Sequence, residues 1–345
     1  PEMEEIFASF YASLRGDLAG YFQTNCPHCQ KITESWYTLY GARRSCSCGE
    51  LLIVDSLTIR QEADGSIIRL CAQCRQVRLG SESCSCGEVA DVSIIERDIT
   101  VCPKCHEAYD EDIDASYFTR YEPLVVSGHC PQHGLFLRSV DELTRGALRQ
   151  ADGERSSLPL NRQDFAVEPG RKSIQLLRRG IDNYLDLFSS RQLLFLQRAI
   201  ELLHELSGPI QLSLALLLST SLEFNSLLSG YKGKNKRRPG AIRHAFAHHA
   251  YSFPYTALEN NPLYHRRASG TLQKLFHARI RRARSWAAKP RERDLSGSKA
   301  GFMEIAGERD IGTEVTDLAA LRHGSHRFLL RQGSAALLDL PDGSV

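Results

Sequence analysis

Cys26-Pro27-His28-Cys29 and Cys130-Pro131-Gln132-His133 enclose the part of the chain from which its architecture follows. All eleven cysteines lie within these limits, and together with one histidine they form six short pairs. The pairs are Cys26/Cys29, Cys46/Cys48, Cys71/Cys74, Cys84/Cys86, Cys102/Cys105 and Cys130/His133. Tetrahedral zinc prefers thiolate and imidazole ligands, and structural sites usually receive them as two short pairs from separate hairpins. Six pairs therefore predict three structural zinc ions.

We expect consecutive pairs to share an ion. The expected sets are Cys26, Cys29, Cys46 and Cys48; Cys71, Cys74, Cys84 and Cys86; and Cys102, Cys105, Cys130 and His133. The string Ser-Cys-Ser-Cys-Gly-Glu occurs at 45–50 and again at 83–88, which indicates a duplicated ribbon. Only one residue separates the two ligands in these CxC pairs, so their spacing fixes the pairing less firmly. His129 is an alternative to His133 in the third set.

The cysteines are expected to be reduced and bound to metal. Their odd number argues against a complete disulfide framework, and no hydrophobic signal segment precedes the first pair. Free or oxidised cysteine is the alternative. These observations favour a cytoplasmic location. No pair of carboxylates, Ser/His/Asp set or reactive cysteine stands out as catalytic, so no catalytic residue is predicted.

The composition predicts a soluble globular protein of two or three domains. The chain has 345 residues, of which 42% are hydrophobic and 24% charged. Its most apolar run, at 209–228, contains Gln211, Ser213, Glu223 and Asn225, so it reads as a buried helix and not as a membrane span. No membrane partner is expected.

Positive charge is concentrated in one segment. Between Gly230 and Arg293 there are 16 lysines and arginines and two acids, in a chain whose net charge is only +2. Aromatic residues are interleaved with these cations, a pattern typical of nucleic-acid binding. DNA is the expected partner, and a solvated basic face is the alternative. The candidate contacts are Lys232, Lys234, Lys236, Arg237, Arg238, Arg243, Arg279, Arg281, Arg282 and Arg284.

The periodicity of apolar residues predicts an α+β protein, with tandem zinc ribbons followed by a mainly helical domain. The expected divisions are a leading helix at 1–20, three tandem zinc ribbons at 21–141, a linker at 142–170, a basic helical DNA-binding domain at 171–295 and a further segment at 301–345. Helices are expected at 171–188, from Ser189 or Ser190 to Gly208, at 210–228 and at 266–288. A strand is expected at 326–333. His244 and His248 have a spacing that could bind a metal, but no third ligand is evident.

Several stretches resemble one family of enzymes. The sequence Asp186-Leu-Phe-Ser-Ser-Arg-Gln-Leu-Leu-Phe-Leu196 resembles the LFxxRQLL motif of large bacterial DNA methylases that carry an internal zinc ribbon. The segments 223–228 and 253–262 are similar to the same family. The segment 327–345 resembles the strand that leads into the catalytic DPPY loop of methyltransferases acting on exocyclic amino groups of adenine or cytosine.

The resemblance implies the middle portion of such an enzyme, ending in the start of an α/β methyltransferase unit. Neither the glycine-rich loop for S-adenosylmethionine nor a DPPY sequence occurs in the 345 residues, so that cofactor is expected only in the full-length enzyme. The implied role is DNA recognition, in modification, restriction or phage defence. The alternative is a non-enzymatic zinc-ribbon adaptor for nucleic acid, or a subunit of a defence complex. A zinc hydrolase would need an open three-ligand site, whereas all three expected sets are closed.

Overall fold

The computed structural model describes residues 2–80, 84, 86–87, 92–232, 242–245, 250–294, 301–305, 312–324, 326–334 and 340. The chain forms two compact units, Pro1–His277 and Ala278–Val345. Helices and strands are mixed throughout the first unit, so the fold class is α+β as expected. None of the helices in these ranges is long and apolar enough to cross a membrane.

The first unit is built on strands from both halves of its sequence. Its strands are β1 (Gln23–Asn25), β2 (Ile32–Cys46), β3 (Gly49–Val54), β4 (Thr58–Gln61), β5 (Ile67–Leu70), β6 (Val77–Leu79), β7 (Ile94–Glu96), β8 (Tyr121–Cys130), β9 (Gly134–Ser139), β10 (Gly230–Tyr231), β11 (Ile242–Arg243) and β12 (Thr256–Asn260). Its helices are α1 (Glu2–Leu18), α2 (Glu142–Arg155), α3 (Ile174–Leu177), α4 (Ser190–His204), α5 (Gly208–Ser221) and α6 (Leu272–Phe276). Single turns of 3-10 helix are η1 (Ala19–Tyr21), η2 (Tyr117–Arg120), η3 (Arg162–Phe165) and η4 (Tyr184–Leu187).

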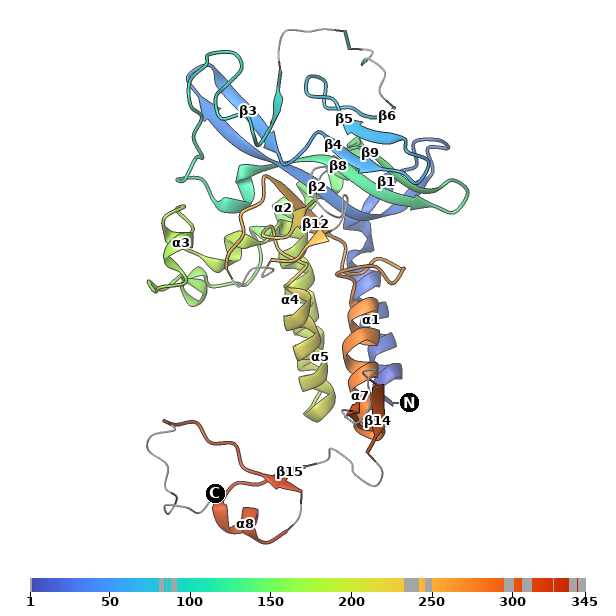
Figure 1. The fold of residues 1–345 in the computed structure, drawn as a ribbon, viewed down its shortest axis with the longest axis vertical. Coiled ribbons are helices and arrows are strands. Elements are labelled where there is room, and N and C mark those ends of the chain that lie inside the picture. The colour runs from blue at the N-terminus through green and yellow to red at the C-terminus, as the bar shows by residue number, and fades with distance from the viewer. Residues whose placement is uncertain are drawn as a thin grey trace. The chain divides into compact units, whose positions relative to one another are not determined.

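Strand β2 is the centre of the main sheet, which has the order β11-β10-β12-β2-β3-β7. Strands β1 and β8 also pair with β2, and β9 pairs with β8. Strands β4, β5 and β6 form a separate antiparallel sheet. In Figure 1, α1, α4 and α5 extend from one side of the main sheet, whereas β4 to β6 lie on its other side. The long β2 therefore carries elements on both faces.

Strand β12 joins the cysteine-rich part of the chain to the helical part. It pairs antiparallel with β2 from Thr256↔Gly41 to Asn260↔Tyr37, although more than 200 residues separate the two strands. The first unit consequently runs without a break across positions 141 and 170, where the sequence suggested domain limits. Residues expected to form a linker begin with helix α2, whose N-terminus is capped by Asp141. The organisation therefore differs from tandem ribbons followed by an independent helical domain.

The expected helices are confirmed to different extents. The expected start of α4 is confirmed, with Ser189 and Gln192 forming a capping box. The helix expected at 210–228 is shorter than predicted, because α5 ends at Ser221. The helix expected at 171–188 is wrong: α3 is one turn long, and Gly180 then adopts a positive φ of 65°. A side chain at Gly180 would collide with the backbone of Ile113, so the chain turns at this residue.

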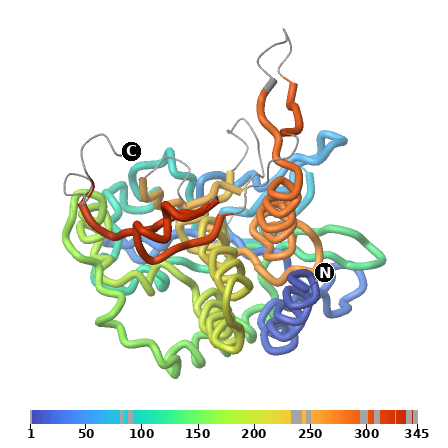
Figure 2. Tube along the Cα trace, turned by 90° about the horizontal axis from the view of Figure 1, so that it is seen from below, coloured from blue at the N-terminus to red at the C-terminus, as the bar shows by residue number. Residues whose placement is uncertain are grey.

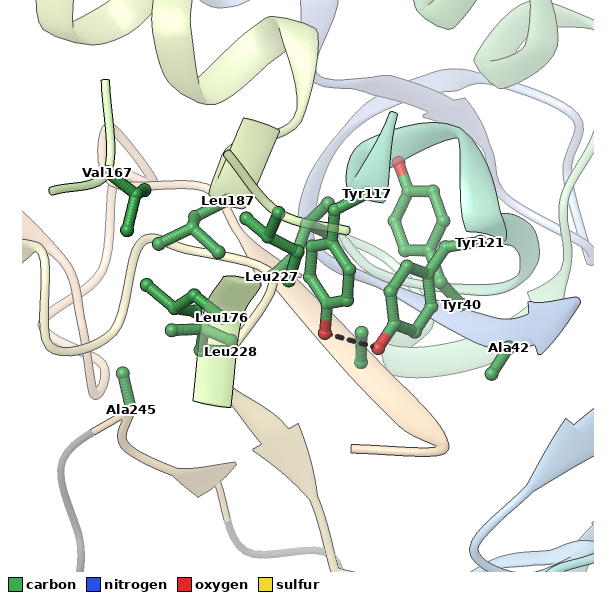
Figure 3. Packing of buried hydrophobic residues seen from close by; sticks show 12 residues of the cluster. Tyr40, Ala42, Tyr117, Tyr121, Val167, Leu176, Leu187, Leu227, Leu228 and Ala245 are labelled. Atoms are coloured by element: carbon green, nitrogen blue, oxygen red, sulfur yellow. Dashed lines mark hydrogen bonds between the residues drawn. The ribbon is translucent and has the colours of Figure 1, made fainter. Parts of the chain in front are cut away.

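Buried residues from both halves of the sequence meet in the core beneath the main sheet. Figure 3 shows Tyr117 and Tyr121 in this cluster, joined by a hydrogen bond of 2.7 Å between their hydroxyl groups. Leu187 and Leu227 pack into the same cluster. A second contact links the first helix to the last part of the unit, because Phe7 of α1 stacks on Phe276 of α6 with ring centroids 3.9 Å apart.

The second unit contains short elements. They are α7 (Arg282–Ala288), α8 (Leu318–Arg322), and the strands β13 (Arg291–Asp294), β14 (Gly301–Glu304), β15 (Thr313–Glu314) and β16 (Arg327–Phe328). A π-helical turn at His277–Arg281 precedes α7 and begins at the last residue of the first unit. Figure 2 shows the β13–β14 hairpin in orange and red after α7. The helix expected at 266–288 is thus interrupted and begins only at Leu272. Of the strand expected at 326–333, only β16 forms, parallel to β15. The residues after Ser334 lie outside the described ranges except Leu340.

Candidate metal centres

The outer centre joins the two ends of the cysteine-rich region. Cys26 and Cys29 lie in the loop between β1 and β2, while Cys130 ends β8 and His133 lies in the turn into β9. The Sγ atoms of Cys29 and Cys130 are 3.8 Å apart. Nδ1 of His133 lies 3.5 Å from Sγ of Cys26 and 3.4 Å from Sγ of Cys130. Pairing of β2 with β8 brings these two loops together.

The middle centre lies at the opposite end of β2. Cys46 ends this strand and Cys48 occupies the turn into β3, while Cys102 and Cys105 lie in the loop after β7. The Sγ atoms of Cys48 and Cys102 are 3.5 Å apart. Two backbone hydrogen bonds between Ser45 and Asp110, of 3.0 and 2.8 Å, fasten this loop to the end of β2.

The inner centre is formed by Cys71, Cys74, Cys84 and Cys86. The first two lie between β5 and β6, and the other two follow β6. The Sγ atoms of Cys71 and Cys86 are 3.8 Å apart, and those of Cys74 and Cys84 are 3.4 Å apart. This set is the one that the order of pairs predicted correctly.

The other two expected sets are wrong in their pairing. The structure combines Cys26 and Cys29 with Cys130 and His133. It combines Cys46 and Cys48 with Cys102 and Cys105. The three centres are therefore nested along the chain instead of consecutive. The reason is the topology of β2, since β8 returns beside its first half and the loop after β7 returns to its end. His129 faces away from the outer centre, with its ring 6.1 Å from that of His265.

The arrangement of the donor atoms fits zinc. The ligand atoms of each set all lie within 4.8 Å of one another, and no two cysteines form a disulfide. A tetrahedron with Zn–S bonds of about 2.3 Å has S···S edges of roughly 3.8 Å, and a mixed S···N edge is slightly shorter. The observed separations of 3.2 to 3.8 Å approach these values. Each set could hold one ion with four protein ligands, the pattern of structural rather than catalytic zinc.

One thiol in each centre has a pKa lowered to about 6, and the pKa of Cys105 in the middle centre is lowered as well. Backbone N–H groups of Cys86 lower the pKa of Cys84 to about 6, and those of Cys105 and Lys104 do the same for Cys102. Burial opposes this effect at Cys130, but the backbone N–H groups of Gln132 and His133 still lower its pKa to about 6. The backbone amides thus stabilise negative charge on these sulfur atoms, as metal binding requires. The neighbouring thiols raise the pKa values of Cys48 and Cys86, and the pKa values of Cys29, Cys46 and Cys74 are also raised.

A shared turn places the two ligands of every pair. The residue directly after the second ligand has a positive φ in all six pairs: Gln30, Arg75, His106, Gly49, Gly87 and Gly134. In the three CxxC pairs, the amide of this residue donates to the carbonyl of the first cysteine at 2.9 to 3.2 Å. The turn aims both sulfur atoms, and the backbone amides, at one point. Glycine after the ligand pair was a sequence signal for this turn, but three of the turns lack glycine.

Replacement of Gln30 by glycine is expected to stabilise the protein slightly. Gln30 has a φ of 56°, a left-handed conformation that costs an ordinary residue about 1 kcal/mol, and its side chain is exposed. Glycine also makes the unfolded chain more flexible than glutamine does, and this offsets part of the gain in stability. Urea unfolding of Gln30→Gly should show a midpoint equal to or above that of the parent. Gln132→Gly, in the neighbouring loop, is the control and should lower the midpoint. A lower midpoint for Gln30→Gly would contradict this account of the turn.

The LFxxRQLL stretch contributes to the interior and not to an open site. Arg191 is 1% exposed and forms an ion pair with Glu259, which is fully buried. The carboxylate also accepts hydrogen bonds of 2.5 Å from Ser189 and from Tyr40. Arg191 donates to Thr38 at 2.9 Å. Burial alone would raise the pKa of Glu259, but the charge of Arg191 holds it below its usual value. This network joins α4 to β2 and β12.

The candidate DNA contacts are only partly described. Lys234, Lys236, Arg237 and Arg238 lie outside the described residues, as does His248. Lys232 and Arg243 are half-buried near the edge of the main sheet. Arg279, Arg281, Arg282 and Arg284 are all exposed on the helical segment at the start of the second unit. Four exposed arginines therefore lie on one short helical segment.

Comparison with known proteins gives no relative: no family model, curated protein or solved structure matches the chain.

Proposed function

We propose that the chain is the zinc-binding, DNA-recognition portion of an S-adenosylmethionine-dependent DNA methyltransferase that modifies an exocyclic amino group of adenine or cytosine. The observation that carries the zinc-binding part is the convergence of twelve Cys and His residues into three closed four-ligand sets. Such sets stabilise a fold and do not activate water, because no coordination position is left open.

The methyltransferase part rests on the resemblance of four stretches of sequence, at 186–196, 223–228, 253–262 and 327–345. Contacts in the fold support treating the first three as one structural element. Arg191 of the LFxxRQLL stretch pairs with Glu259 in the 253–262 segment, and the amide of Leu227 in the 223–228 segment donates to the carbonyl of Leu187 at 2.8 Å. All three stretches therefore serve one buried junction. In this proposal, the junction stabilises the first unit, and the basic segment holds DNA while another part of the enzyme transfers the methyl group.

Salt-dependent DNA binding tests the recognition role. Replacing Arg279, Arg282 and Arg284 with glutamine should reduce affinity for duplex DNA at least 10-fold at moderate salt. Each lost phosphate contact should lower the slope of log K against log salt by about 0.9. Fluorescence anisotropy of a labelled duplex over a range of salt concentrations measures both quantities. Glutamine retains helix propensity, so the fold should persist.

The matched control is Arg145→Gln with Arg149→Gln. Both side chains are exposed on α2 and lie outside the basic segment. The double variant should bind DNA within about twofold of the parent, since neither residue is expected to touch phosphate. Equal losses in both variants would indicate unspecific attraction by net charge and would contradict a defined DNA surface.

The catalytic part of the proposal needs the complete gene product. Transfer of a labelled methyl group from S-adenosylmethionine to DNA by that product is the expected result. DNA binding without cofactor binding or methyl transfer would instead support the non-enzymatic adaptor, which shares the zinc centres and the basic surface.

A further inference from the structure

The small sheet of β4, β5 and β6 has two different faces. Ile68 and Leu70 of β5, and Val77 of β6, turn one face toward a hydrophobic cluster beneath it. The opposite face carries a row of three residues in direct register, Thr58, Arg69 and Arg78. The alternation of side chains along a strand fixes this division. Two arginines therefore stand directly opposite each other on neighbouring strands.

Two arginines placed in this way attract negative charge to this face of the sheet. Like charges at directly opposed positions of a sheet destabilise it. In the described part of the chain, the buried Nε atom of Arg69 has no hydrogen-bond partner. By contrast, Arg60 on β4 forms an ion pair with Glu62 at 2.8 Å.

Both arginines line a cavity of about 800 Å³. Ser56, Thr58 and Glu96 also contribute to its wall. The carboxylate of Glu96 already accepts hydrogen bonds from the Leu57 amide at 2.7 Å and from the Ser56 hydroxyl at 3.2 Å. The cavity thus holds two guanidinium groups and one carboxylate, of which the Oε1 atom accepts both hydrogen bonds from the wall.

We propose that this cavity binds a phosphate group through Arg69 and Arg78. Guanidinium groups present paired N–H donors whose spacing matches two oxygens of a phosphate. The Thr58 hydroxyl, in the same row, supplies a further donor. The phosphate can belong to a DNA strand or to a free phosphate compound. The DNA source deepens the function proposed above and rests on it, whereas the free source does not.

The nearby inner metal centre provides a competing explanation. A zinc ion with four thiolates carries two net negative charges, and Cys71 and Cys84 border the same cavity. The arginines would then neutralise the centre. If the arginines have this role, the protein should lose zinc when Arg69 and Arg78 are replaced. A phosphate site predicts no such loss of zinc.

The test compares Arg69→Gln/Arg78→Gln with Arg60→Gln, a control on the same sheet outside the cavity wall. Three measurements are made on the full chain: zinc content, anisotropy of a labelled duplex against salt, and calorimetric titration with inorganic phosphate. The double variant should keep its zinc, lose about 10-fold in duplex affinity and lower the salt slope by about 1 to 2. Arg60→Gln should match the parent.

The outcomes separate this inference from the proposed function. Loss of phosphate binding with unchanged DNA binding would assign the site to a free phosphate compound. A parent protein that binds phosphate through Arg69 but binds no DNA would remove the proposed function and keep the site. Unchanged binding of both ligands, or loss of zinc in the double variant, would overturn the inference.

Discussion

Cys130→Ser is expected to unfold the first compact unit, whereas Cys84→Ser should affect only the small sheet of β4, β5 and β6. Cys130 is fully buried, and with His133 it ties β8 and β9 to the loop before β2. Cys29 and Cys130 are 101 residues apart, whereas Cys74 and Cys84 are only 10 apart. Closing the longer loop restricts the unfolded chain by about 2 kcal/mol more. The outer centre also lies in the sheet that holds the unit together.

Zinc content and urea unfolding measure this difference. The Cys130→Ser variant should lose more than one zinc ion per chain, because its sheet supports the middle centre as well. Cys84→Ser should retain two ions and most of the cooperative transition. Lys31→Ala, at an exposed position of the loop between β1 and β2, is the control and should change neither quantity. Equal destabilisation by both cysteine variants would show that the centres contribute independently of their place in the sheet.

Arg191→Met is expected to destabilise the protein by about 3 to 5 kcal/mol, because it leaves the carboxylate of Glu259 buried without its cation. The matched control is Arg198→Met on the same helix. Arg198 forms an ion pair of 2.6 Å with Asp17, but Arg198 is only half-buried and Asp17 is exposed, so its loss should cost at most about 1 kcal/mol. Urea unfolding of the two variants gives both values.

Two further measurements test the buried pair. Arg191→Met combined with Glu259→Leu removes both charges and should be less destabilised than the sum of the single variants. The depressed pKa of Glu259 contributes stability at neutral pH that is lost as the pH falls below the usual glutamate range. The parent should therefore lose more stability on acidification than the double variant. Additive effects, with parallel pH profiles, would contradict a coupled pair.

The fold was predictable from sequence where the signal is local. Ser189 and Gln192 at the start of α4 form a capping box, and the apolar steps of α1 mark a helix along their whole length. The pairing of β12 with β2 was not predictable, because strands separated by more than 200 residues leave no local pattern of their partnership. The domain limits placed at composition changes consequently do not coincide with the compact units.

The candidate metal ligands were chosen by residue type and spacing alone, and all twelve converge in three sets that could each hold an ion. Their partners depended on strand order, which spacing does not encode. Arg69 and Arg78 escaped notice for a related reason. They are nine positions apart in the sequence and become neighbours only through the register of β5 and β6.

The nested order of the three centres has a consequence for synthesis on the ribosome. The first ligands to emerge, Cys26 and Cys29, belong to the centre that is completed last, with His133. At about 5 to 20 residues per second, these early thiols wait roughly 5 to 20 seconds for their partners. The inner centre is complete as soon as Cys86 has left the exit tunnel. During translation the centres are therefore completed in the order inner, middle and outer. A shortage of zinc at this stage would leave Cys26 and Cys29 without a metal for the longest time.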